Sequence, residues 1–155
     1  MITFAHELFA EQALRRPDAT AVVAGRTRVT YRELDESASR LAHYLTEAGA
    51  GPEAVTGLHL ERGVDLIRAI LAVMKAGAGY LPLDPSLPAE RLARICSQVR
   101  PAAVITGEAD AFPFPGTGTR LLPLRELAAD LARRPVTAPV TRPHPDNLCY
   151  VIYTS

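Results

Sequence analysis

The chain has 155 residues and a formal net charge of zero, with 17 basic and 17 acidic side chains. This length can bury roughly 70 % of the unfolded surface in one core, and the balanced charge argues against nucleic acid or an anionic membrane surface as the main partner. Two cysteines, Cys96 and Cys149, are too few for a disulfide framework or a metal site. The acidic first turns and the lack of a long apolar stretch predict no signal peptide and no membrane span, so we expect a cytoplasmic protein.

The first third of the chain predicts a helix, a hairpin and a second helix. Apolar residues recur at helical spacing over residues 3–16, and residues 20–31 form two short β-type runs around a Gly-Arg turn. Thr30 precedes the second helix and Glu33 follows three residues later, which is the spacing of a capping box. The second helix should end near Gly49.

The middle of the chain alternates strands with helices. Strands are expected over residues 55–60, 80–83 and 102–106, and helices over residues 64–75 and 88–98. This alternation is typical of right-handed βαβ units and predicts an α/β fold with a largely parallel sheet flanked by helices. The apolar stripe of the first of these helices comprises Leu66, Ile67, Ile70, Leu71 and Met74.

The last third begins with a Gly-, Pro- and Thr-rich stretch. Residues 107–119 predict an exposed loop, followed by a short strand near Leu121 and a helix over residues 124–133. A Pro-rich connector over residues 135–145 then leads into an apolar run at residues 148–153, which predicts a buried strand. Two hydroxyl residues follow this strand at its carboxyl end, where open α/β sheets usually place their ligand site.

Three segments carry a resemblance to a known family. They are Val29-Thr30-Tyr31-Arg32-Glu33-Leu34, Met74-Lys75-Ala76-Gly77-Ala78-Gly79-Tyr80-Leu81-Pro82-Leu83-Asp84-Pro85 and Tyr150-Val151-Ile152-Tyr153-Thr154-Ser155. In this order and at these intervals they resemble the first three core motifs of the adenylation domains of non-ribosomal peptide synthetases, within the adenylate-forming superfamily. The resemblance covers essentially the whole chain, and one departure is Gly79, where the family more often has alanine.

The resemblance implies a fold, a reaction and partners. Residues 1–155 would be an incomplete N-terminal subdomain of an adenylation domain, cut at the start of the phosphate-binding loop. The complete enzyme would use ATP and Mg²⁺ to convert an amino acid or an aryl acid into an acyl-adenylate. It would then pass the acyl group to the phosphopantetheine thiol of a peptidyl carrier protein, beside other synthetase domains.

The same resemblance assigns Thr154 and Ser155 to the loop that cradles the ATP phosphates. Backbone N–H groups and hydroxyls at the end of a strand form an anion site, although either hydroxyl could instead only cap the next turn. The family's catalytic lysine and its metal-binding and substrate-selecting residues lie downstream of these positions. We therefore expect no catalytic or metal-binding residue in this chain, and no activity of the chain alone.

Other conspicuous residues have structural interpretations. Lys75, the only lysine, lies in a last helical turn and should interact with the helix dipole. Asp84 before a proline should form a turn, and Cys149 should be a small core residue. The histidines show no ligand spacing and are interpreted as surface or packing residues: His6, His43, His59 and His144. An alternative function from another class is a non-catalytic interaction module that folds against a separate remainder or a neighbouring synthetase domain.

Overall fold

A four-stranded parallel sheet forms the centre of the protein. The computed structural model describes residues 3–113 and 118–154. The sheet has the order β4-β3-β5-β6, and its strands are β3 (Val55–His59), β4 (Gly79–Pro82), β5 (Ala103–Thr106) and β6 (Arg120–Pro123). Every neighbouring pair of these strands is parallel. The predicted α/β fold with a parallel sheet flanked by helices is therefore confirmed.

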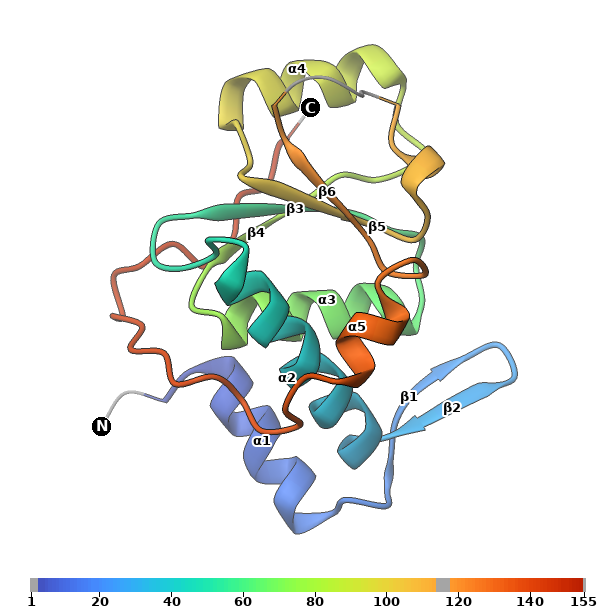
Figure 1. Ribbon diagram of the computed structural model, residues 1–155, viewed down its shortest axis with the longest axis vertical. Coiled ribbons are helices and arrows are strands. Elements are labelled where there is room, and N and C mark those ends of the chain that lie inside the picture. The colour runs from blue at the N-terminus through green and yellow to red at the C-terminus, as the bar shows by residue number, and fades with distance from the viewer. Residues whose placement is uncertain (1–2, 114–117, 155) are drawn as a thin grey trace.

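Helices cover both faces of the sheet (Figure 1). They are α1 (Ala5–Arg15), α2 (Tyr31–Glu47), α3 (Val64–Lys75), α4 (Ala89–Val99) and α5 (Ala128–Ala132). Leu58 and Ile105 point to the face that packs against α2, α3 and α5, whereas Leu81 and Val104 point to the face covered by α4. Alternate residues of each strand thus reach opposite cores, which explains why these strands are apolar throughout.

The helix α2 begins as its sequence predicts. The Thr30 hydroxyl accepts a hydrogen bond from the Glu33 N–H at 3.2 Å, and the Glu33 carboxylate accepts one from the Thr30 N–H at 2.8 Å. The predicted capping box is therefore confirmed. The predicted apolar stripe of α3 is only partly right, because Ile67 is 38 % exposed. Small residues, chiefly Ala69 and Ala72, are fully buried instead. Their short side chains let α2 and α3 approach closely.

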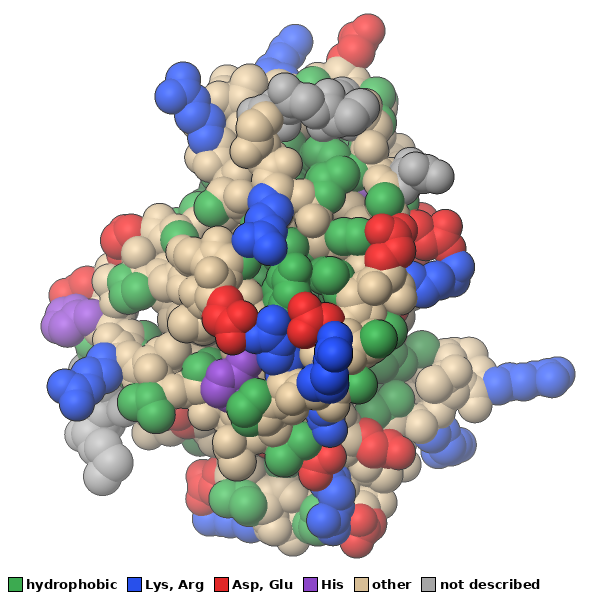
Figure 2. All heavy atoms as spheres, in the orientation of Figure 1, with side chains coloured by type: hydrophobic (Ala, Val, Ile, Leu, Met, Phe, Trp, Pro, Cys, Tyr) green, Lys and Arg blue, Asp and Glu red, His purple; other side chains and the backbone are tan. Residues whose placement is uncertain are grey.

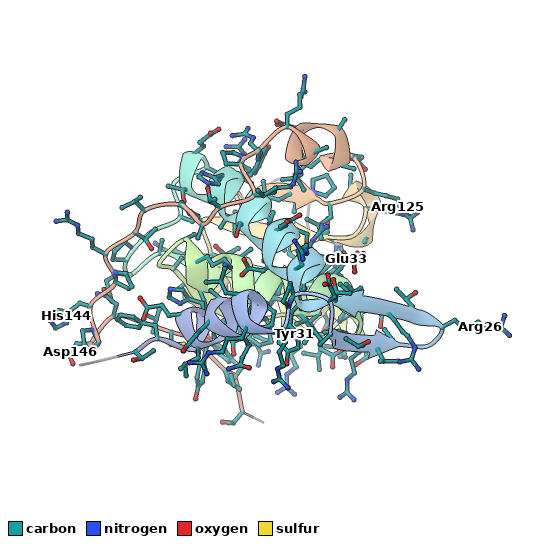
Figure 3. The ribbon with its side chains drawn as sticks, turned by 90° about the horizontal axis from the view of Figure 1, so that it is seen from below. Arg26, Tyr31, Glu33, Arg125, His144 and Asp146 are labelled. Atoms are coloured by element: carbon teal, nitrogen blue, oxygen red, sulfur yellow. The ribbon has the colours of Figure 1, made fainter. Side chains whose placement is uncertain are left out.

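The strands β1 (Thr20–Ala24) and β2 (Thr27–Thr30) form a separate antiparallel hairpin. Figure 1 shows this hairpin projecting from the body, and Figure 3 places Arg26 at its tip. Its inward-facing Val22 and Val29 pack against the larger core. The hairpin therefore belongs to the body through one face only.

The segment between β5 and α5 differs from its prediction. The predicted loop over residues 107–119 contains a 3₁₀ turn, η1 (Ala109–Ala111), and residues 114–117 lie outside the described part. Phe112 is only 4 % exposed, because its ring packs edge-on against His59. The helix predicted over residues 124–133 forms only as α5, since Leu124 to Leu127 make hydrogen-bonded turns first.

Acidic and basic side chains are interspersed on the face seen in Figure 2. This mixture agrees with the balanced composition and gives that face no extended field of one sign. Within residues 3–113 and 118–154, no helix combines the length and apolar character that a membrane crossing requires.

Candidate functional site

The segment that should carry the phosphate-binding residues meets the sheet at a single position. Tyr150 forms an isolated parallel bridge with Tyr80 of β4. The Tyr80 N–H donates to the Cys149 carbonyl at 3.1 Å, and the Val151 N–H donates to the Tyr80 carbonyl at 2.9 Å. The prediction of a buried strand over residues 148–153 is therefore wrong. We call residues 141–154 the terminal arm and the described residues before them the body.

Burial explains why the terminal arm does not form a full strand. Tyr150 and Ile152 are 52 % and 59 % exposed, because the arm has β4 on one side and no strand on the other among the described residues. Of the described residues that follow Leu148, Val151 packs against the core beneath α4. Cys149 is exposed, so its prediction as a core residue is also wrong.

The two predicted phosphate-binding residues end the terminal arm. Thr154 is exposed and has no regular secondary structure, and Ser155 lies outside the described residues. The arm runs parallel to β4 at Tyr150 and therefore heads towards the carboxyl ends of the strands there. The Tyr153 hydroxyl then donates to the side chain of Gln98 at 2.8 Å, which places the arm beside α4. The assignment of Thr154 and Ser155 to a nucleotide stays a prediction.

The turn between α3 and β4 is shaped to receive the terminal arm. Gly77 has a φ of +76°, which favours glycine. A Cβ on Gly79 would lie 3.0 Å from the Leu148 side chain and 3.3 Å from its carbonyl oxygen. The Thr141 hydroxyl also donates to the Lys75 carbonyl at 3.1 Å. The second motif therefore acts as scaffold for the third.

Lys75 has a partner that its sequence position did not reveal. Its ammonium lies 2.7 Å from the Asp35 carboxylate of α2, and its side chain is only 1 % exposed. Lys75 lies in the last turn of α3 as predicted, and its interaction with the helix dipole stays a prediction. The structure adds an ion pair between the buried ammonium and the partly exposed carboxylate of Asp35. Asp35 is remote in sequence, and only the packing of the two helices brings the charges together.

Sequence reasoning missed a crevice at the carboxyl edge of the sheet. Its volume is about 630 Å³, and it is lined by the ends of β3 and β5, the start of α3, and part of the hairpin. The chain leaves β3 for β4 through α3 and reaches β5 through α4 on the opposite face, so this edge is a topological switch point. Finding the crevice requires the order of the strands in the sheet, and the sequence alone did not predict that order.

Three polar side chains around the crevice, those of His59, Arg125 and Glu108, have partners within the protein. Both ring nitrogens of His59 lie 2.9 Å from carbonyl oxygens, those of Leu83 and Ala111. Arg125, labelled in Figure 3, forms an ion pair with Glu108. In the described part of the chain, no group of three or more His, Cys, Asp or Glu side chains could hold a metal ion. Among these residues the crevice therefore offers no cluster of ligands for a metal ion.

Asp84 at the end of β4 behaves as the sequence predicts. Its carboxylate accepts a hydrogen bond from the Ser86 N–H at 2.9 Å, and this bond holds the pKa of the Asp84 carboxyl below its ordinary value. The Asp84 side chain therefore stabilises the turn into α4.

Comparison with known proteins gives relatives over the whole chain. A family model of AMP-binding enzymes matches residues 9–155. Chondramide synthase cmdD of Chondromyces crocatus is 42 % identical over 153 residues, which cover 97 % of this chain and 4 % of that protein. Phosphinothricin tripeptide synthetase PhsC of Streptomyces viridochromogenes is 43 % identical over 152 residues, which cover 97 % of this chain and 14 % of the relative. The chain thus spans a small fraction of these relatives.

Solved structures share the fold. The non-ribosomal peptide synthetase FmoA3 superimposes with a TM-score of 0.88 at 34 % identity, over 99 % of this chain and 16 % of that one. The N-terminal subdomain of Klebsiella oxytoca NpsA superimposes with a TM-score of 0.82 at 25 % identity, over 97 % of this chain and 38 % of that one. The resemblance based on the three motifs is confirmed. The chain belongs to the AMP-binding enzyme family and corresponds to the N-terminal part of a non-ribosomal peptide synthetase adenylation domain.

Proposed function

We propose that this chain is the N-terminal portion of an enzyme that activates an amino acid or an aryl acid with ATP. The enzyme would form an acyl-adenylate and pass the acyl group to the phosphopantetheine thiol of a peptidyl carrier protein. The observation that carries the proposal is the family match across residues 9–155, together with a terminal arm docked on the turn of the second motif. One similar structure, FmoA3, was solved with AMPPNP bound, which supports ATP as the nucleotide.

The role of this chain follows from the charges of the reactants. A carboxylate and a triphosphate repel each other, so the enzyme must offset negative charge and align the reacting groups. In this proposal the body supplies a rigid sheet edge, and the arm delivers Thr154 and Ser155 to the phosphates. Hydroxyl and backbone N–H groups there would donate hydrogen bonds to phosphate oxygens.

The described residues do not by themselves fit ATP with Mg²⁺. No cluster of three or more candidate ligand side chains exists within residues 3–113 and 118–154. Of the two predicted phosphate-binding hydroxyls, the described part contains only that of Thr154, which is exposed. We therefore expect the 155 residues alone to be inactive, and we derive no catalytic step from them.

A chimaera tests the proposal. The 155 residues replace the matching segment of a related adenylation domain, and ATP–pyrophosphate exchange is measured with that relative's own substrate. We expect exchange well above background, because identities near 40 % preserve the fold. A folded but inactive chimaera would contradict the proposal, and turnover by the isolated 155 residues would contradict their expected inactivity.

A second function is favoured by one observation, the apolar exposed arm. Tyr150, Ile152 and Tyr153 expose 52 %, 59 % and 39 % of their surface along an edge that no other strand covers in the described chain. Such an edge can pair with another segment. The chain would then be a non-catalytic module that folds against a separately made remainder or a neighbouring synthetase domain. A pull-down with the complementary fragment of a relative tests this function, and absence of association would exclude it.

A further inference from the structure

A strained residue far from the terminal arm in sequence touches the arm directly. Glu53 lies between α2 and β3 and has a φ of +64°, in the left-handed region that non-glycine residues rarely adopt. The turn around it is closed by a hydrogen bond from the Ala54 N–H to the Gly51 carbonyl at 3.1 Å. Such backbone outliers persist where the surrounding structure requires them, and they often have a functional reason.

The carboxylate of Glu53 holds two consecutive residues of the arm. Its Oε1 accepts hydrogen bonds from the Asn147 side-chain amide at 3.0 Å and from the Leu148 N–H at 3.1 Å. Asn147 is itself fixed, because its side-chain oxygen accepts from the His144 N–H at 2.7 Å and its own N–H donates to the His144 carbonyl at 2.9 Å. His144 and Asp146 in Figure 3 mark this turn at one end of the molecule.

The contact with Glu53 lies directly before the residues that join the arm to β4. The next residue, Cys149, and then Val151 make the two backbone hydrogen bonds that join the arm to Tyr80. Leu148 is meanwhile packed against the bare Cα of Gly79. A shift of one residue would place the opposite set of side chains against the core. With so few bonds to β4, the register of the arm depends on where Leu148 is held.

We propose that Glu53 is a positioning residue for the phosphate-binding end of the arm. Its carboxylate fixes Asn147 and Leu148, which sets the register of Val151 on β4 and thereby the position of Thr154. The left-handed backbone at Glu53 is the conformation that directs the carboxylate to the arm. This inference rests on the proposed function, because the arm is taken to lead to the nucleotide phosphates.

Three substitutions separate the carboxylate from the backbone strain. Glu53→Met keeps the length of the side chain but removes the acceptor, Glu53→Gln keeps an acceptor oxygen, and Glu53→Gly relieves the left-handed backbone while removing the carboxylate. The control is Glu90→Met, since Glu90 is exposed on α4 and its side chain forms no hydrogen bond or ion pair with the described residues. All four variants are made in the 155-residue chain and compared with the wild type.

Amide hydrogen exchange measures, without any ligand, how firmly the Glu53 carboxylate holds the arm. In Glu53→Met we expect the Leu148 and Val151 amides to exchange about tenfold faster, the effect of losing one charge-assisted hydrogen bond. Glu53→Gly should match Glu53→Met, Glu53→Gln should fall between them and the wild type, and Glu90→Met should leave both amides unchanged. Wild-type exchange in Glu53→Met, or full protection in Glu53→Gly, would overturn the proposal.

Kinetics in the chimaera then tests the link to the phosphates. Glu53→Met should raise the KM for MgATP about tenfold, and Glu53→Gln should restore part of the loss. Unchanged KM and kcat despite faster arm exchange would overturn the positioning role and leave Glu53 a purely structural contact. If the wild-type chimaera shows no exchange activity, the proposed function fails, while hydrogen exchange in the chain still decides whether Glu53 holds the arm.

Discussion

The strand β5 and the terminal arm are both short apolar runs, yet they have opposite surroundings. β5 pairs with a strand on each side and has helices over both faces, and Val104 and Ile105 are 0 % exposed. The arm pairs with β4 at Tyr150 alone, and Ile152 is 59 % exposed. An apolar β-type run thus becomes a buried strand only where neighbouring strands and helices are supplied.

The two regions are also held by different forces. The body is stabilised by burial of large side chains, which contributes about 1.5–3 kcal/mol for each fully buried one. The arm is held by hydrogen bonds to Glu53, Lys75 and Tyr80, each with a net contribution of about 0.5–3 kcal/mol. Substitutions in the body should therefore change global stability, whereas substitutions in the arm should change local order.

The largest expected loss of stability comes from breaking the ion pair between Asp35 of α2 and the buried Lys75 of α3. Asp35→Ala leaves the Lys75 ammonium, whose side chain is 1 % exposed, without its carboxylate. Loss of one partner of a buried pair costs about 3–5 kcal/mol, and chemical denaturation would show it. Replacing both residues, Asp35→Leu with Lys75→Met, should recover most of this loss. A single-variant loss below about 1 kcal/mol would mean that the pair does not hold the body together.

A smaller loss of stability is expected when a methyl group is added at Gly57, which lies close to Leu83 and Val104. A Cβ at Gly57 would lie 2.8 Å from a Leu83 methyl and 2.9 Å from a Val104 methyl, so Gly57→Ala should cost about 1–3 kcal/mol. Gly51→Ala is the matched control, because a Cβ there meets nothing within 4 Å. Equal denaturation midpoints for the two variants would show that the body tolerates changes as readily as its surface.

The third prediction concerns the pH dependence of the start of α2. The Thr30 N–H and then the Thr30 hydroxyl bond to the Glu33 carboxylate and lower the pKa of Glu33. Because this pKa is lower in the folded than in the unfolded state, the stabilisation is present above the ordinary carboxyl range and is lost as the pH falls through the lowered pKa. The difference in urea midpoint between wild type and Glu33→Gln should therefore shrink with falling pH. A difference that stays constant with pH would contradict the capping role.

The smallest effect is expected in the arm itself. Ile152→Lys should change the free energy of unfolding by less than about 0.5 kcal/mol, since Ile152 is 59 % exposed. The same substitution should reduce self-association, because charge on an open edge opposes pairing. Light scattering and denaturation measure the two effects. A loss of stability above about 1 kcal/mol would show that the arm belongs to the body after all.

The elements of the body could be predicted because their patterns are local. The helix at residues 64–75 and the capping box at Thr30 and Glu33 follow from spacing alone, and both are confirmed. The stripe of α3 was misjudged because this helix is contacted on several sides, so its small alanines face the closest neighbours. The terminal strand was misjudged because composition does not report whether a neighbouring strand exists.

The site was less accessible from the sequence. Thr154 and Ser155 could be named only through the family resemblance, since two hydroxyl residues carry little information of their own. The partners Asp35 and Glu53 lie about 40 and 95 residues from the groups they bind, and only tertiary packing reveals such pairs. The crevice at the sheet edge likewise required the order of the strands.

Native-state hydrogen exchange across the whole chain tests the central distinction most directly. We expect the amides of β3 and β5 to exchange only through global unfolding, with a free energy equal to that from denaturation. The Val151 amide, bonded to the Tyr80 carbonyl at 2.9 Å, should exchange through local opening and much faster. Equal protection of the Val151 and Ile105 amides would contradict the distinction between a cooperatively folded body and an arm that opens locally.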